Sequence, residues 1–232
     1  MTNLAAAVLD PLLRADASKP RITYSDDATG ERIELSTVTF ANWAAKTGNL
    51  LRDELGAGPG SRVALLLPAH WQTAAVVFGV WWIGAEVVLG AGDADVVMGT
   101  AARLAEAEAD EVVALSLDPF GRPVDDLPVG VTDYATSVRL QADQIVAERR
   151  AGPALGGRSA DDVLAASMDS AAAHGISGGD RVLSTADWDT DTVLVDGLAA
   201  VFAVGASLVQ VAHPEPSALE RHRITENVTV TL

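Results

Sequence analysis

The stretch Gly58-Pro-Gly-Ser-Arg-Val-Ala-Leu-Leu-Leu-Pro68 decides the fold class of this chain. Residues 63–67 within it form a continuous apolar run, which is typical of a strand buried on both faces in a parallel sheet. A helical pattern follows over residues 71–83, and a second apolar run covers residues 85–89. Two strands joined by a helix form a parallel pair with a right-handed crossover, so this segment predicts a βαβ unit.

The same pattern recurs about 120 residues later in the chain. Gly60-Ser-Arg-Val63 and Gly84-Ala-Glu-Val-Val-Leu89 in the first half are echoed by Gly179-Asp-Arg-Val182 and Gly205-Ala-Ser-Leu-Val209 in the second. An internal repeat of this kind indicates a duplicated architecture. We therefore predict an α/β fold with two similar Rossmann-like subdomains, whose mostly parallel sheets are flanked by helices.

The stretch between the two copies differs in composition. Residues 118–157 are rich in Pro, Gly and Asp and have poor periodicity, so they predict an irregular connector with a helix at about 143–150. The expected organisation is a first α/β subdomain over 1–117, the connector over 118–157 and a second α/β subdomain over 158–232. The alternative is that the two subdomains pack closely into one structural unit.

Apolar spacing and capping residues place further elements around the repeats. Ser36 or Thr37 can cap a helix that runs to about Leu55, and Ser159, with Asp162 three residues later, can cap a helix that runs to residue 174. The other expected helices cover 4–13, 101–109, 193–204 and 217–226, and the other expected strands cover 21–24, 32–35, 112–117, 182–184, 206–211 and 228–232.

The composition excludes several classes of function. The 232 residues include no cysteine, which excludes disulfides, thiolate metal sites and a cysteine nucleophile. The net charge of −16 and the pI near 4.4 repel phosphate backbones, so we expect no nucleic-acid partner. The N-terminus has no early basic cluster, and the apolar run 74–85 is too short for a bilayer. We therefore expect a cytoplasmic protein without membrane insertion.

Several of these segments resemble the adenylate-forming superfamily, which holds acyl-CoA synthetases, the adenylation domains of peptide synthetases, and luciferases. The resemblance covers about two thirds of the chain and runs through 21–24, 35–51, 58–68, 80–89, 178–184, 197–206 and 227–231. It is most specific at Gly-Pro-Gly-x-Arg-Val and at the Gly-Ala pairs that follow two helices. The resemblance implies the fold of the N-terminal region of acyl-CoA synthetases, and a family chemistry that uses ATP and yields AMP.

The chain departs from the family where the family's chemistry resides. In the family, a Ser/Thr/Gly-rich loop with a lysine wraps the ATP phosphates, because backbone N–H groups and hydroxyls reach phosphoryl oxygens. The matching stretch here, 147–159, has no Ser/Thr cluster and no lysine, and the only lysines, Lys19 and Lys46, match no catalytic position. The family's aromatic-Gly-x-Thr-Glu motif, ribose-binding Asp and C-terminal lysine would fall beyond residue 232. The resemblance therefore implies a catalytically incomplete protein.

One stretch still suits a weak anion or phosphate site. Gly152-Pro-Ala-Leu-Gly-Gly-Arg-Ser159 nearly spells a phosphate loop with Arg in place of Lys, but the charged residues before it do not form a buried strand. The candidate nucleotide-binding residues are Gly156, Gly157, Arg158 and Ser159, at the N-terminus of the helix that Ser159 caps. The favoured alternative is a Gly-rich turn into a capped helix, without a ligand.

No other group of residues predicts a metal or catalytic site. Asp187-Trp-Asp-Thr-Asp191 resembles a calcium loop, but Thr192 and Leu198 stand where such a loop needs Gly and Glu. The four histidines, at 70, 174, 213 and 222, lack metal-ligand spacing. His70 and His213 follow predicted strands, where open sheets bind ligands, although most residues in such loops have no such role.

Three hypotheses follow, and none includes a catalytic residue that the sequence identifies. The first is a pseudoenzyme that acts as a binding or assembly module, without a cofactor, as a homodimer or with a protein partner. Adjacent Trp81 and Trp82 face different sides of one helix, which suits either packing between two layers or an interface anchor.

The second hypothesis is a residual binder of nucleotide or acyl-adenylate, with ATP or AMP and Mg, or a ligase-like activity that a partner chain completes. The third, an unrelated small α/β enzyme, lacks a convergent nucleophile, base and orienting group.

Overall fold

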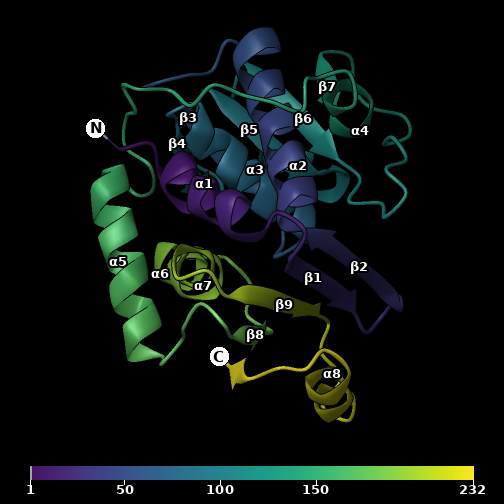
Figure 1. The fold of residues 1–232 in the computed structure, drawn as a ribbon. Helices are drawn as coiled ribbons and strands as arrows, with labels where there is room; N and C mark the ends of the chain where they lie inside the picture. The colour runs from purple at the N-terminus through teal and green to yellow at the C-terminus, as the bar shows by residue number, and fades with distance from the viewer. Residues whose placement is uncertain (1) are drawn as a thin grey trace.

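The computed structural model describes residues 2–232 and contains two five-stranded sheets (Figure 1). The strands of sheet 1 are β3 (Arg62–Leu66), β4 (Glu86–Leu89), β5 (Val96–Thr100), β6 (Glu111–Leu115) and β7 (Val131–Asp133). They run in the order β4-β3-β5-β6-β7, and every neighbouring pair is parallel. The strands of sheet 2 are β1 (Pro20–Asp26), β2 (Glu31–Ser36), β8 (Arg181–Ser184), β9 (Ser207–Ala212) and β10 (Val230–Thr231). Their order is β10-β8-β9-β1-β2, and only the β1–β2 hairpin is antiparallel.

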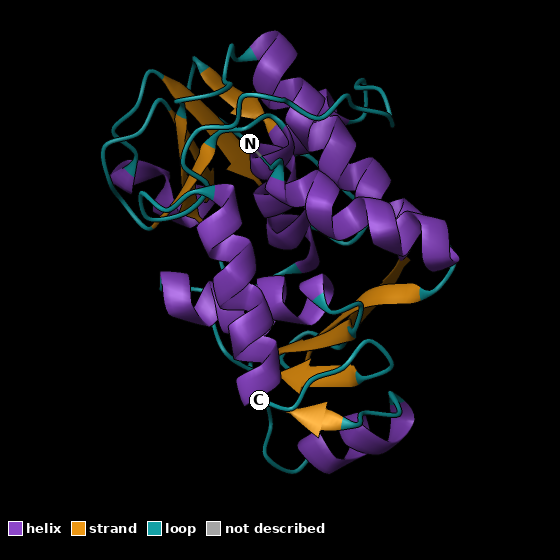
Figure 2. Ribbon diagram, turned by 60° about the vertical axis from the view of Figure 1, so that its left-hand side comes forward, coloured by secondary structure: helices purple, strands orange, loops and turns teal. Residues whose placement is uncertain are grey.

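Helices α1 (Leu4–Asp16), α2 (Thr37–Asn49) and α3 (Trp71–Trp82) lie between the sheets, as Figures 1 and 2 show. Every residue of α3 is buried, because α1, α2, β1 and β4 all pack on it. Trp81 and Trp82 are therefore both inside the chain, and Trp81 Nε1 donates to the Ala154 carbonyl at 2.9 Å. Of the two alternatives for this pair, packing between layers is confirmed.

The remaining helical segments flank the sheets or connect them. The four-residue α6 continues through a π-helical turn, η3, into α7, so the expected helix over 193–204 is one interrupted rod. The segments are η1 (Leu50–Glu54), η2 (Ala101–Glu106), α4 (Tyr134–Val138), α5 (Ala160–Ala173), α6 (Asp191–Leu194), η3 (Val195–Ala199), α7 (Ala200–Ala203) and α8 (Leu219–Thr225). Across residues 2–232, no helix combines the length and the apolar character needed to cross a membrane.

The internal repeat is confirmed as a structural repeat. In the first copy, β3, α3 and β4 form a βαβ unit whose strands are parallel neighbours. In the second copy, β8 and β9 are parallel neighbours, and α6, η3 and α7 connect them. The α/β fold with two mostly parallel sheets flanked by helices is therefore as the sequence predicts.

The two sheets do not follow the expected boundary between the subdomains. β1 and β2 fall within 1–117, yet they belong to sheet 2, where Ile22 of β1 lies opposite Leu208 of β9. Local patterns show the β1–β2 hairpin, but they cannot show a parallel pairing between residues so far apart in the chain. The segment before β3 thus contributes to the sheet of the second half.

The segment 118–157 is more regular at its start than expected, and the helix expected at 143–150 is absent. β7 and α4 lie in its first part, and residues 141–150 run without a helix or strand. Asn49 Nδ2 donates to the carbonyls of Ala142 and Gln144, and Asn3 Nδ2 donates to the carbonyl of Glu148. A helix over 143–150 would use the Ala142 and Gln144 carbonyls for its own hydrogen bonds, so the prediction from the side-chain pattern was wrong here.

Two further elements of sheet 1 differ from expectation. β5 occupies a stretch for which the sequence pattern predicts no element, because its five residues follow a run of Gly and Asp and include Gly99. The helix expected over 101–109 is a shorter 3₁₀ helix that ends at Glu106. Both differences bear on the site, because β5 and η2 contribute to its wall.

Candidate functional site

A cleft of about 550 Å³ lies where strands of both sheets end. From sheet 1, the cleft receives Leu67 and Pro68 after β3, Gly90 after β4 and Thr100 at the end of β5. From sheet 2, the loop after β8 lines the cleft from Asp187 onward. Open α/β sheets bind their ligands outside the carboxyl ends of parallel strands. This cleft is therefore the candidate binding site.

The charged groups of the cleft give it an acidic rim. Asp187 and Asp189 are exposed on the loop after β8. Arg103 is the one basic residue in the lining, and it makes a two-point pair with Glu106, at 2.9 Å from Nε and 2.7 Å from Nη2. Stabilising a transferring phosphoryl group needs free positive charge or a metal ion. The cleft lining offers no free cation, and residues 2–232 contain no carboxylate or histidine cluster suited to a metal ion.

Trp188 fixes the loop that carries the two aspartates. Its side chain is buried, and its Nε1 faces Gly197 of η3 so closely that a Cβ at position 197 would come within 3.1 Å of it. A side chain at position 197 would therefore have to push the indole away by a few tenths of an ångström. The loop is anchored on the helix behind it, and the neighbouring carboxylates face outward.

His70 and His213 follow β3 and β9, as the sequence predicts, but neither lines the cleft. His70 is buried and caps α3, because its Nδ1 accepts the N–H of Gln72 at 3.1 Å. Its Nε2 lies 3.9 Å from Glu31 Oε1, which is too far for a hydrogen bond, and burial lowers the pKa of His70. His213 is exposed and lies 2.9 Å from Asp26 Oδ1. Both histidines hold local structure together.

The four predicted nucleotide-binding residues lie together at the N-terminus of α5. Gly156 and Gly157 have φ of +56° and +74°, so the turn needs glycine at both positions. Ser159 caps α5 as predicted: its Oγ accepts the N–H of Asp162, and the Asp162 carboxylate accepts from Ser159 in return. These hydrogen bonds from Ser159 hold the pKa of Asp162 below its usual value.

Carboxylates of the same chain already face the donors of this turn. The N–H of Gly157 donates to Glu86 Oε1 at 2.6 Å, and Arg158 Nη2 lies 3.8 Å from Asp191 Oδ2. Asp191 sits against the turn so closely that a Cβ at Gly156 would collide with its Oδ2. An added phosphate would meet three carboxylates, those of Glu86, Asp162 and Asp191. Anion binding by Gly156, Gly157, Arg158 and Ser159 stays a prediction.

Sequence reasoning did not identify the cleft itself. Its wall includes Thr100 and Arg103, from β5 and η2, which the sequence pattern does not show as a strand followed by a 3₁₀ turn. The available signal was the rule that ligands bind at the carboxyl ends of strands, which needs the correct strands first. The acidic stretch 187–191 resembles an incomplete calcium loop in sequence, and that pattern does not indicate a cleft.

The chain is similar to a curated protein along its whole length, although no family model matches it. A protein of Mycobacterium tuberculosis (strain ATCC 25618 / H37Rv), described as "TIGR03089 family protein", is 64% identical over 239 residues. The match covers 100% of this chain and 98% of that protein. The two proteins therefore correspond along their lengths.

Three solved structures have the same fold. An acyl-CoA synthetase of Brucella canis has a TM-score of 0.82 at 17% identity, over 99% of this chain and 47% of that chain. A benzoate CoA ligase of Burkholderia xenovorans LB400 has a TM-score of 0.77 at 18% identity (100% and 50%), and the anthranilate CoA ligase AuaEII in complex with anthranoyl-AMP has 0.71 at 18% (90% and 44%). The chain spans about half the length of each. At this identity the likeness shows the fold alone, which is that of the N-terminal region of acyl-CoA synthetases.

Proposed function

The chain belongs to the TIGR03089 family, and we propose that it is a pseudoenzyme: a catalytically incomplete protein of adenylate-forming fold that acts as a binding or assembly module. One observation carries this proposal. At the start of α5, the N–H of Gly157 and the side chains of Arg158 and Ser159 already interact with Glu86, Asp191 and Asp162. Adenylation needs these kinds of donors for phosphoryl oxygens, and here the chain's own carboxylates occupy them.

We place the ligand of this module in the cleft between the two sheets. Its volume of about 550 Å³ is within the usual range for small-molecule sites. Leu65, Leu67 and Pro68 supply an apolar wall, and Asp187 and Asp189 supply the acidic rim. This combination favours a neutral or cationic small molecule over a nucleotide, so no ATP, AMP or Mg is part of the proposal.

The test removes the carboxylates that occupy the turn. In Glu86→Gln/Asp191→Asn, the N–H of Gly157 and the guanidinium of Arg158 lose their charged partners, so we expect calorimetry to detect Mg·ATP binding that the unmodified protein lacks up to about 1 mM. The matched control is Asp10→Asn/Asp125→Asn, which changes the net charge equally at exposed positions. Binding by the unmodified protein, or equal behaviour of the two double variants, contradicts the role given to these carboxylates.

A second variant separates the pseudoenzyme from a residual nucleotide binder. Arg158→Ala removes the one basic side chain at the turn. The pseudoenzyme proposal predicts that Arg158→Ala leaves every binding property unchanged. A residual binder would lose its nucleotide affinity in this variant.

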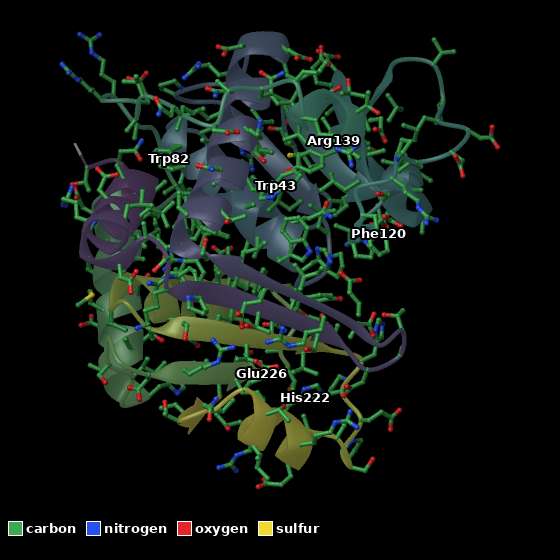
Figure 3. The ribbon with its side chains drawn as sticks, turned by 45° about the vertical axis from the view of Figure 1, so that its right-hand side comes forward. Trp43, Trp82, Phe120, Arg139, His222 and Glu226 are labelled. Atoms are coloured by element: carbon green, nitrogen blue, oxygen red, sulfur yellow. The ribbon has the colours of Figure 1, made fainter. Side chains whose placement is uncertain are left out.

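The module is proposed to associate, as a homodimer or with a protein partner. Phe120 and Leu140 have exposed fractions of 78% and 80%, and the Arg139 guanidinium ties the Phe120 loop to the end of α4 (Figure 3). A partner chain that covered these exposed side chains would remove apolar surface from water. Light scattering on the purified protein should give twice the 24.0 kDa chain mass, and Phe120→Asp should return it to one chain mass. A single-chain mass for the unmodified protein contradicts the homodimer, and Ile224→Asp is the control at another exposed apolar residue.

A further inference from the structure

Arg21 of β1 is a buried cation that forms no ion pair with any residue in the described range 2–232. Arg21 is only 2% exposed. Its Nε donates to Thr37 Oγ1 at 3.3 Å, and its Nη1 donates to the Ala206 carbonyl. A guanidinium has five N–H groups, so three of them have no partner within that range.

A buried charge without a counter-charge is unfavourable, and Arg21 stays charged nevertheless. Burial lowers the pKa of Arg21 to about 10, which still leaves the group protonated at neutral pH. The Phe202 ring, 5.8 Å away, supplies a cation–π contact that offsets part of the desolvation. Asp16 is the acidic residue whose charge acts on Arg21, and the two side chains do not form an ion pair, so the guanidinium keeps unpartnered N–H groups. The position therefore suits an anion from outside the chain.

Arg21 lines a cavity of about 430 Å³ between α1 and the turn from α7 to β9. Its apolar wall comes from Val8, Pro11 and Leu12 of α1 and from Val204. The space is equivalent to about fourteen water molecules, which is far more than a bare inorganic anion fills. An occupant that matches the wall has an apolar part as well as a charge.

Two further charged side chains set the charge that the cavity accepts. Lys19 lies at the rim, where its Nζ donates to the Gly178 carbonyl at 3.2 Å and makes no ion pair within the described chain. Asp16 also lines the cavity, and its carboxylate accepts from the N–H and the hydroxyl of Ser18. The two cations, Arg21 and Lys19, and the carboxylate of Asp16 leave the cavity with one net positive charge. A bound monoanion neutralises that charge.

We propose that this cavity binds a small amphiphilic monoanion, with its charged group on Arg21 and Lys19 and a short alkyl chain against α1. The site is separate from the cleft and from the N-terminus of α5, and it shares no residue with either. It therefore goes beyond the proposed function, and either can fail without the other.

The experiment compares three probes by calorimetry at constant ionic strength: 1-butanesulfonate, methanesulfonate and 1-butanol. The unmodified protein should bind butanesulfonate about tenfold more tightly than methanesulfonate, because only the first also covers the apolar wall, and 1-butanol should not bind. Arg21→Met should abolish butanesulfonate binding, and Lys19→Gln should weaken it about threefold. Arg14→Gln is the matched control, since it removes an exposed cation from the last turn of α1.

Replacing a buried charge by an apolar side chain of similar size is often neutral for folding, so Arg21→Met is expected to fold. If Arg21→Met does not fold, Lys19→Gln alone tests the proposal, because the Lys19 side chain lies at the rim of the cavity. The proposal is wrong if butanesulfonate does not bind up to about 10 mM, or if it binds no more tightly than methanesulfonate. It is also wrong if Lys19→Gln and Arg14→Gln bind it equally. Heat from Mg·ATP in the same protein would contradict the proposed function and leave this site untouched.

Discussion

At the scale of single residues, Glu226 is the centre of the ion network that ties α8 to sheet 2. Its carboxylate accepts from Arg32 Nε at 2.7 Å and Nη2 at 2.9 Å, and from Arg181 Nη2 at 2.8 Å. The Glu226 side chain is 7% exposed, whereas the Arg32 side chain is half-exposed, so the carboxylate end of the network is the shielded one. Hydrogen bonds from Arg32, and then from Arg181, hold the pKa of Glu226 below its usual value. The network therefore favours the ionised carboxylate in the folded protein.

Glu226→Gln should lower the free energy of unfolding at pH 7 by about 2 kcal/mol, because Arg32 and Arg181 then keep only the more exposed Glu34 as a shared carboxylate. The depressed pKa fixes the pH dependence. The contribution of Glu226 to the free energy of unfolding is fully present above the pKa of the unfolded chain, about 4.3. It is lost as the pH falls through the lower pKa of Glu226 in the folded protein. Urea unfolding between pH 7 and pH 3 should therefore show a shallower loss of stability in the variant. Glu220→Gln, at an exposed position, is the control, and equal pH profiles for the two variants would contradict the account.

The Gly156–Ser159 turn separates what the sequence can and cannot predict about a site. Ser159 and Asp162 are three residues apart, so their reciprocal cap is a local pattern that the sequence shows correctly. Glu86 and Asp191 reach the same turn from other elements, and no local pattern records those contacts. The sequence identifies the residues of the turn. Only the folded structure shows which carboxylates interact with them.

At the scale of elements, α2 and α3 approach each other at glycines. A Cβ at Gly79 of α3 would lie 2.9 Å from the Ala44 carbonyl oxygen and 2.9 Å from Thr47 Cβ, both on α2. Gly48 of α2 lies at the same crossing, since its backbone N would be 3.0 Å from that Cβ. α2 also packs on β1 and β2, and α3 packs on β4, so this crossing lies between strands of the two sheets.

Gly79→Ala should destabilise the protein by about 1–3 kcal/mol, because the added methyl group forces α2 and α3 apart. An alanine in an exposed helix would stabilise instead, so the sign of the change is diagnostic. Gly58→Ala is the control, because a Cβ at Gly58 meets nothing within 4 Å. Thermal and urea unfolding of both variants measure the difference. A stabilised Gly79→Ala protein would show that the helices are not in this close contact.

Elements with a strong local pattern could be predicted, and those defined by distant partners could not. The apolar runs of β3, β4 and β9 and the capped helix α5 follow from sequence directly. β5 is short and glycine-containing, and its place at the centre of sheet 1 comes from its neighbours β3 and β6. The residues at 143–150 have helix-compatible side chains, but Asn3 and Asn49 hold their backbone in another conformation.

At the scale of the whole molecule, the chain visits sheet 2 first, builds sheet 1, and then returns to sheet 2. The sequence repeat correctly indicates two similar α/β units, and β1 and β2, which lie outside both copies of the repeat, join the sheet of the second copy. The return path places the loop after β8 beside the ends of β3 and β5, and this arrangement creates the cleft. The binding site is thus a property of the assembled molecule, and no single repeat contains it.

We propose that this chain does not bind the nucleotide on its own. The most direct measurement is a calorimetric titration of the purified, unmodified protein with Mg·ATP and then with AMP. The occupied turn at α5 and the acidic rim of the cleft predict no heat of binding up to about 1 mM of either nucleotide. A dissociation constant below about 0.1 mM, equivalent to about −5.5 kcal/mol, would contradict the claim and identify the chain as a nucleotide binder.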